Sequence, residues 1–171
     1  MKEEKVLNHA TVCFPVKDGQ IMLGIKTRKI GEGCWNGYGG GVEAGERVKE
    51  TAIRELAEET GGIKAGIEDL EEIAIVDYHN TKSDGTTFEC RVHFYLVTNW
   101  SGVASDTSEM IRPTWFAIDA LPLEGMMLAD KEWLPLALRG KKLMVKVSYG
   151  PFHKTLLSKV EVQEVDFFSG D

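Results

Sequence analysis

Short apolar runs separated by turn residues extend along most of the chain. Two of them, residues 11–16 and 20–26, flank the turn-like Lys17-Asp18-Gly19, which predicts a hairpin. Further strands are predicted over three apolar runs: residues 72–78, 88–98 and 112–118. A last hairpin is predicted from residues 142–148 and 154–165, on either side of the turn Tyr149-Gly150-Pro151.

Two segments have a helical pattern instead. Residues 47–60 are followed by Gly61-Gly62, which predicts the end of that helix. Residues 130–139 form the second predicted helix, and four of its apolar side chains are expected to pack inward: Trp133, Leu134, Leu136 and Ala137. We therefore predict an α/β fold, an α/β/α sandwich with a central mixed β-sheet and two main helices. Because no repeat or linker divides residues 1–171, a single domain is expected.

The composition narrows the class of protein. The chain of 171 residues is 43% hydrophobic and 27% charged, as in a globular protein, and its net charge is −7. This charge argues against a partner such as a nucleic-acid polymer, whose phosphates require basic surface. No apolar run reaches the ~18–20 residues of a membrane span. The start, MKEEKVLNHA, is charged where a signal peptide would be apolar. We expect a cytoplasmic, monomeric protein that does not bind membranes.

Cysteine and histidine give no pattern of a metal site. Cys13, Cys34 and Cys90 are odd in number and form no CxxC pair, which gives no support to a zinc cluster or a disulfide framework. Cys13 and Cys90 lie in apolar runs and are predicted to be buried. The histidines have no HxxxH or HExxH spacing, so each is interpreted as a surface or packed side chain: His9, His79, His93 and His153.

The helix over residues 47–60 carries the most informative chemistry. At 100° per residue, Glu55, Glu58 and Glu59 share one direction, roughly 120° from the apolar stripe. A solvated charged face is the ordinary interpretation of such acids. However, Glu55 and Glu59 repel each other at a cost of ~0.2–0.5 kcal/mol, and the acids lie at the negative end of the helix dipole. Arg54 relieves part of this repulsion by pairing with Glu50 or Glu58. Three converging carboxylates match the oxygen ligands that Mg²⁺ or Mn²⁺ prefers.

A glycine-dense loop, residues 31–45, precedes this helix. Its Gly39-Gly40-Gly41 lets the backbone approach a metal ion or a phosphate closely. No GK[ST] follows the glycines, so the loop is not a Walker motif.

Residues 40–62 resemble the signature of the Nudix hydrolases. That signature is a glycine, five residues, a glutamate, seven residues, and then R-E-aliphatic-x-E-E-x-G-aliphatic. Its positions are filled here by Gly40, Glu46, Arg54, Glu55, Leu56, Glu58, Glu59 and Gly61. The closing aliphatic position is Gly62, with Ile63 one place later, a departure that affects the helix exit.

The resemblance implies a hydrolase acting on a nucleoside diphosphate linked to another group, with Mg²⁺ as cofactor and Mn²⁺ as a substitute. It implies that Glu55, Glu58 and Glu59 bind the metal with help from the Gly40 carbonyl. Arg54 would orient these glutamates, and Glu46 would support the loop.

Nearly the whole chain is similar to the MutT-type members of this family that act on oxidised purine nucleoside triphosphates. This similarity implies that Asn36 reads a purine edge, that Lys26 contacts phosphate, and that Thr11 and Ile30 line the base pocket. Asp130 stands where the second of two base-reading acids is expected. From the residues alone, Asn36 could equally be a turn residue, and Asp130 could be a helix N-cap.

Three positions bear on how far this similarity extends. Met127 replaces an expected tryptophan, and Ala129 replaces the other base-reading acid, so an altered base selectivity is expected. Glu109 is the candidate for a further metal ligand, although it lies one residue further from Arg112-Pro113 than the family pattern predicts.

We expect hydrolysis of oxidised or modified purine deoxynucleoside triphosphates, such as 8-oxo-dGTP or 2-hydroxy-dATP, to the monophosphate and pyrophosphate, which would cleanse the nucleotide pool. The substrate would be a small nucleotide. One alternative is a Nudix hydrolase acting on ADP-ribose or a dinucleoside polyphosphate. Another is a catalytically silent domain that binds nucleotides, which the intact acidic triad opposes.

Overall fold

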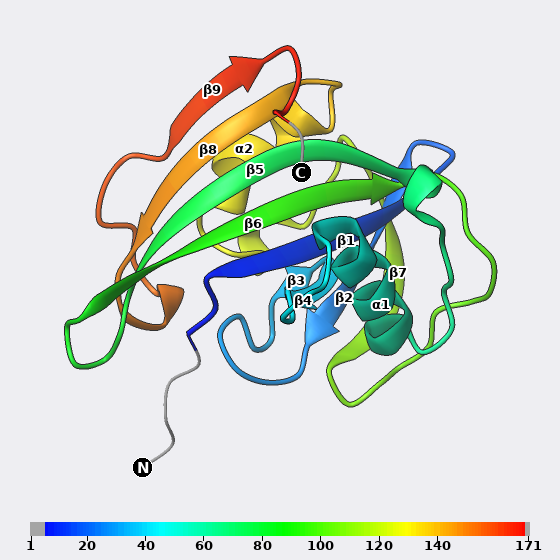
Figure 1. Cartoon of the computed structure of the whole chain (residues 1–171), viewed down its shortest axis with the longest axis horizontal. Coiled ribbons are helices and arrows are strands. Elements are labelled where there is room, and N and C mark those ends of the chain that lie inside the picture. Colours follow the sequence, from blue (N-terminus) through cyan, green and yellow to red (C-terminus); the bar gives the residue numbers. More distant parts are fainter. Residues whose placement is uncertain (1–5, 170–171) are drawn as a thin grey trace.

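The computed structural model describes residues 6–169 (Figure 1). Residues 1–5, which belong to the charged N-terminal stretch considered above, lie outside the described residues. The strands are β1 His9–Lys17, β2 Gln20–Lys26, β3 Trp35–Asn36, β4 Tyr38–Gly41, β5 Leu70–Thr81, β6 Thr87–Val97, β7 Met110–Ala117, β8 Lys142–Tyr149 and β9 Glu161–Val165. The helices are α1 Val48–Thr60 and α2 Asp130–Ala137, with the short 3₁₀ turns η1 Ile67–Asp69, η2 Leu123–Gly125 and η3 Pro151–His153.

The strands form a mixed sheet in the order β3-β2-β1-β6-β5-β8-β9, with β4 paired to β1 and β7 paired to β2. β1 runs parallel to β6 and β5 runs parallel to β8, whereas the hairpin of β5 and β6 is antiparallel. α1 lies on one face of the sheet and α2 on the other (Figure 1). The predicted α/β sandwich with a mixed sheet and two main helices is therefore confirmed.

Each helix packs on its own hydrophobic cluster. On the α2 side, Trp133 is fully buried, and its ring meets that of Phe94 edge-on with centroids 4.6 Å apart. On the α1 side, Cys13 is buried with Leu56, and its thiol donates to the carbonyl of Ala52. The predicted burial of Cys13 and Cys90 is confirmed. The sheet therefore has a hydrophobic layer on each face.

Three expectations about single elements are wrong. The glycine loop contains two short strands, β3 and β4, because its backbone pairs with β2 and β1. The last strand begins only at Glu161, because η3 turns the chain away from β8 after Gly150. In α2, which ends at Ala137, Leu136 is 40% exposed because it lies on the face turned away from the sheet.

Within residues 6–169, none of the helices combines the length and the apolar character that crossing a membrane requires.

Candidate active site

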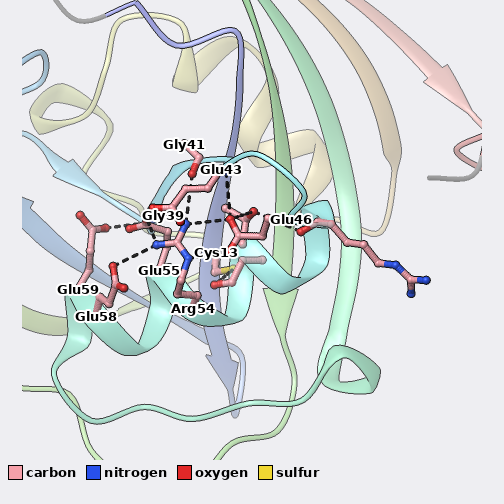
Figure 2. A network of polar contacts seen from close by, with 12 residues as sticks. Cys13, Gly39, Gly41, Glu43, Glu46, Arg54, Glu55, Glu58 and Glu59 are labelled. Carbon is pink, nitrogen blue, oxygen red and sulfur yellow. Dashed lines mark hydrogen bonds and ion pairs between the residues drawn. The ribbon is translucent and has the colours of Figure 1, made fainter.

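The acidic face of α1 meets the glycine loop around the guanidinium of Arg54 (Figure 2). Arg54 Nε donates to Glu46 Oε2 over 2.6 Å and its Nη2 donates to Glu46 Oε1 over 3.0 Å. Its Nη1 donates to Glu55 Oε1 at 2.9 Å and to Glu58 Oε2 at 3.2 Å. The expected pair with Glu58 is therefore present. Glu50, the other partner considered, accepts the backbone N–H of Arg47 instead.

Glu46 joins the loop to the helix. Besides Arg54, it accepts the hydroxyl of Thr51 at 2.6 Å and the backbone N–H of Glu43 at 3.2 Å. The hydrogen bond from Arg54 is the largest cause that lowers the pKa of Glu46, to about 2, and the Thr51 hydroxyl adds to it. Glu46 is thus held as an anion, and it fixes the position from which Arg54 reaches the other acids.

Glu59 is the most buried acid of the group. It accepts the backbone N–H of Gly39 at 2.8 Å, which connects α1 to β4. Burial raises the pKa of Glu59 to about 7, and the charges of Glu55 and Glu109 act in the same direction, while the Gly39 amide opposes them. A cation beside Glu59 would offset this loss of solvation.

Gly40 allows the helix to approach the loop. A Cβ built on Gly40 would lie 2.5 Å from Cδ of Glu55 and 2.6 Å from its Oε1. A side chain at this position would displace the carboxylate, so glycine leaves the space in which carboxylate and backbone oxygens come together. The structure therefore brings the predicted ligand Gly40 beside Glu55.

The donor set fits a divalent cation that prefers oxygen ligands. The carboxylates of α1 and the backbone carbonyl of Gly40 are oxygen ligands of the kind that such a cation takes. In the described part of the chain, no three acidic, histidine or cysteine side chains are arranged as a ready-made metal site. The reason is visible in Figure 2, where Arg54 pairs with Glu55 and Glu58 while Glu59 accepts from Gly39. These three side chains would have to turn toward a bound ion.

Glu109 directly precedes β7 and forms an ion pair with Arg28. It lies near enough to Glu59 for its charge to raise the pKa of that residue, after burial and Glu55. The structure thus brings Glu109 toward the acidic cluster despite its unexpected spacing in the sequence.

A second group surrounds Asp130, the first residue of α2. The N-cap is Ala129, so Asp130 does not have the N-cap position considered for it. Asp130 is only 6% exposed. Burial raises the pKa of its carboxyl group to about 7, although a hydrogen bond from the Met127 backbone amide acts to lower it. Burial, and then the charge of Asp130, raise the pKa of Tyr78 and of Cys34. We refer to Asp130, Tyr78 and Cys34 together as the Asp130 patch.

Lys26 is the last residue of β2, and its charge acts on residues of both groups. Its charge acts to lower the pKa of Glu59 in the acidic cluster, and of Cys34 beside Asp130, although burial raises both values. A Cβ built on Gly31 would lie 3.1 Å from Met127 Sδ and 3.2 Å from Lys26 Cδ. Met127 therefore lies close to Lys26, and Ile30 comes directly before Gly31.

For two other predicted residues, the contacts found within residues 6–169 do not involve Asp130. Asn36, the last residue of β3, accepts the backbone N–H of Gly37 at 2.8 Å through its Oδ1. Thr11 is buried and lies two residues from Cys13, which packs on α1, so strand alternation directs both side chains to that face. The structure does not bring Thr11 to the α2 side with Asp130. The predicted contacts of Asn36 and Thr11 with a base stay predictions.

Sequence reasoning missed the aromatic neighbours of Asp130. Tyr149, the last residue of β8, accepts the backbone N–H of Ala129 at 2.8 Å through its hydroxyl oxygen. The ring of Tyr78 lies parallel to that of Tyr149, with centroids 6.0 Å apart. Tyr149 was recognised only as part of a turn, and no local signal connects it with a residue of α2.

Comparisons with known proteins agree with this geometry. The profile of the NUDIX domain matches residues 7–137. The oxidized purine nucleoside triphosphate hydrolase of Danio rerio is 36% identical over 134 residues, which cover 78% of this chain and 81% of that protein. The protein of the same name from Mus musculus is 31% identical over 158 residues, which cover 92% of this chain and 96% of that protein.

Solved structures give the same result. The crystal structure of the mutator MutT protein from Bacillus halodurans superposes with a TM-score of 0.72 at 27% identity, and the match covers 91% of this chain and 97% of that one. The MutT NUDIX hydrolase from Burkholderia pseudomallei superposes with a TM-score of 0.63, also at 27% identity, over 79% of this chain and 98% of that one. Fold, signature residues and relatives agree, and the chain belongs to the Nudix hydrolase family.

Proposed function

We propose that the protein hydrolyses purine nucleoside triphosphates, with oxidised purines preferred, to the monophosphate and pyrophosphate in the presence of Mg²⁺. The observation that carries this proposal is the acidic cluster of α1, in which Glu55 and Glu58 surround Arg54 and Glu59 meets the glycine loop, with Lys26 near enough to Glu59 for its charge to act on that carboxylate. In a nucleotide, the polyphosphate is at one end and the base at the other. The acidic cluster would bind the cations on the polyphosphate, Lys26 would contact a phosphate, and the Asp130 patch would bind the base. The names of the relatives from Danio rerio and Mus musculus support the same substrate class.

Charge explains why a cation is needed. A triphosphate carries about four negative charges, and the protein itself has a net charge of −7. A bound divalent cation would neutralise phosphoryl oxygens and lower the pKa of a water molecule. Glu55, Glu58 and Glu59 would hold this cation, with the carbonyl of Gly40 and with Glu109 as further ligands.

Other steps of the reaction depend on residues of the chain. Arg54, anchored on Glu46, keeps the carboxylates of Glu55 and Glu58 in place. One carboxylate of the cluster accepts the proton of the attacking water. The water oxygen forms a bond to phosphorus while the bond to the bridging oxygen breaks, and Lys26 compensates charge on the phosphate chain. Asp130 holds the base.

A substrate panel tests the proposal. Pyrophosphate release is measured with Mg²⁺ from dGTP, 8-oxo-dGTP, 2-hydroxy-dATP and O6-methyl-dGTP, and hydrolysis of ADP-ribose is measured beside them. We expect the highest kcat/KM for an oxidised purine triphosphate. A higher kcat/KM for ADP-ribose would refute the proposed substrate class.

Glu58→Gln tests the role of the acidic cluster. The Glu58 side chain is 59% exposed, so the variant is expected to fold normally. Loss of one ligand charge should lower kcat/KM at least a hundredfold, about 2.7 kcal/mol of barrier, and raise the Mg²⁺ concentration needed for half-maximal rate. Glu89→Gln is the matched control, because Glu89 is an exposed acid paired with His79 at a distance from the cluster. If Glu58→Gln stayed within threefold of the wild type, the metal assignment would be wrong.

A further inference from the structure

Three parallel rings lie beside Asp130. The imidazole of His153 stacks on the ring of Tyr149 with centroids 4.1 Å apart and an interplanar angle of 12°. It also lies parallel to the ring of Tyr78, at 6.2 Å and 14°. The two tyrosines come from the neighbouring strands β5 and β8, whereas His153 comes from η3, which follows β8 (Figure 1). The histidine is thus delivered to the stack by a separate turn.

Backbone contacts fix the position of this turn. Gly150 N–H donates to the Thr155 carbonyl at 2.8 Å, and Leu157 N–H donates to the Ser148 carbonyl at 2.9 Å. Phe152 and His153 have φ values of 59° and 57°, in the left-handed region that residues with a Cβ rarely adopt. Such strained positions persist where the surrounding structure determines them, and they are frequent at ligand-binding sites. The ring of His153 is therefore held in place.

Both ring nitrogens of His153 lack a protein partner. Nδ1 and Nε2 are buried, and neither has a hydrogen bond to any described residue. Buried polar atoms are nearly always satisfied in folded proteins, so two such atoms on one ring require an explanation. Burial lowers the pKa of His153 to about 4, and the charge of Lys26 acts in the same direction. The imidazole is neutral near pH 7 and offers one donor and one acceptor.

The stack is connected to the base-reading patch. Tyr149 accepts the backbone N–H of Ala129, the residue before Asp130. The charge of Asp130 contributes to the raised pKa of Tyr149 and of Tyr78, after burial in both cases. The charge of Lys26, the proposed phosphate contact, also helps to lower the pKa of His153. A base bound at the start of α2 would lie close to Tyr149, on which the His153 ring stacks.

We propose that His153 is a specificity-determining residue that contacts the edge of the purine base through one of its unpartnered ring nitrogens. This inference rests on the proposed function, because it assumes a purine nucleotide at the Asp130 patch. A neutral imidazole can donate to, or accept from, a polar group of an oxidised purine that an ordinary purine lacks. With Ala129 in place of a second acid, His153 supplies a further polar group, stacked on Tyr149.

His153→Phe tests the proposal, because phenylalanine keeps a flat ring on Tyr149 and removes both nitrogens. We expect the ratio of kcat/KM for 8-oxo-dGTP to that for dGTP to change at least tenfold, with the Mg²⁺ requirement unaltered. His79→Phe is the matched control, since its histidine is exposed and pairs with Glu89. A ratio within twofold of the wild type in His153→Phe would show that the nitrogens do not read the base.

A binding measurement separates this inference from the proposed function. Imidazole NMR signals of His153 in the full-length wild type, assigned by their loss in His153→Phe, are followed during titration with 8-oxo-dGMP and, separately, with pyrophosphate. We expect a shift with the nucleotide only. If the wild type hydrolysed no purine triphosphate but the nucleotide still shifted these signals, the proposed function would fail and the His153 contact would stand. Signals unmoved by the nucleotide in an active enzyme would overturn the His153 proposal alone.

Discussion

Replacing Arg54 with alanine should destabilise the whole protein as well as impair the site. Arg54 makes a two-pronged contact with Glu46 across the loop and also neutralises Glu55 and Glu58. Without it, three acids would face one another with no basic side chain between them. The contact with Glu46 joins residues that are eight positions apart, so its loss also loosens the attachment of the glycine loop to α1.

The pKa of Glu46 gives the size of the effect. A pKa of about 2 in place of 4.5 corresponds to about 3 kcal/mol of preferential stabilisation of the charged form. A quarter of the Arg54 side chain, 26%, is exposed to solvent, which screens the pair. We therefore expect Arg54→Ala to lower the free energy of unfolding by about 2 kcal/mol at pH 7.

The dependence on pH has a definite sign. The folded protein binds the proton of Glu46 more weakly than the unfolded chain does, so the stabilisation is complete above about pH 5 and is lost as the pH falls toward 2. In Arg54→Ala the pKa of Glu46 returns toward its usual value, and the variant should lose less stability than the wild type between pH 7 and pH 3.

Urea unfolding followed by tryptophan fluorescence measures both effects. Arg91→Ala is the control, because Arg91 makes a similar two-pronged contact with Asp77, at 2.8 and 3.0 Å, but its side chain is 50% exposed. We expect this control to lose at most about 1 kcal/mol. Equal losses in the two variants, or an unchanged acid dependence in Arg54→Ala, would refute the reasoning.

Two further predictions concern the backbone and the buried acid. Gly39→Ala should lower the free energy of unfolding by about 3 kcal/mol, because its Cβ would overlap the Thr11 carbonyl in the β1–β4 pair. The control is Gly19→Ala, since Gly19 has a φ of 74° but open space around it. This variant should lower the free energy of unfolding by only about 1 kcal/mol. Thermal unfolding compares them, and similar losses would contradict the predicted overlap. Asp130→Asn should be more stable than the wild type by about 4 kcal/mol at pH 9 and nearly equal to it at pH 4. The sign follows because burial raises the pKa of Asp130 to about 7, so the folded state resists ionisation as the pH rises. Urea unfolding at both pH values checks this, and a less stable variant at pH 9 would count against the burial of an unpaired charge.

The parts of the molecule that the sequence predicts are governed by local geometry. The rotation of 100° per residue suffices to place Glu55, Glu58 and Glu59 on one side of α1. Gly61 ends this helix with φ of 74°, as its lack of a side chain predicts. Strands of ordinary length, such as β5 and β6, were recognised within a few residues of their bounds.

The parts that sequence reasoning missed depend on contacts distant along the chain. β3 and β4 are short, and β4 is glycine-rich, so they exist only because β2 and β1 offer their edges. The main partner of Arg54 is Glu46, which lies in the loop before α1 and belongs to no helical spacing. His153 reaches Tyr78 because η3 folds back over β5 and β8, and a lone histidine after a Gly-Pro turn carries no sign of this.

The parallel pairing of β1 with β6 has a consequence for the growing chain during synthesis. β1 begins at His9, and its partner in register there is Arg91, past the middle of the chain. Contacts between such distant segments form late, because the intervening loop must close before they can contribute. The β1–β2 hairpin and the β1–β4 pair can form without β6, because all their residues lie before α1. The other edge of β1 stays unpaired until β6 has left the ribosome, so a partly synthesised chain exposes an open strand edge beside the acidic helix.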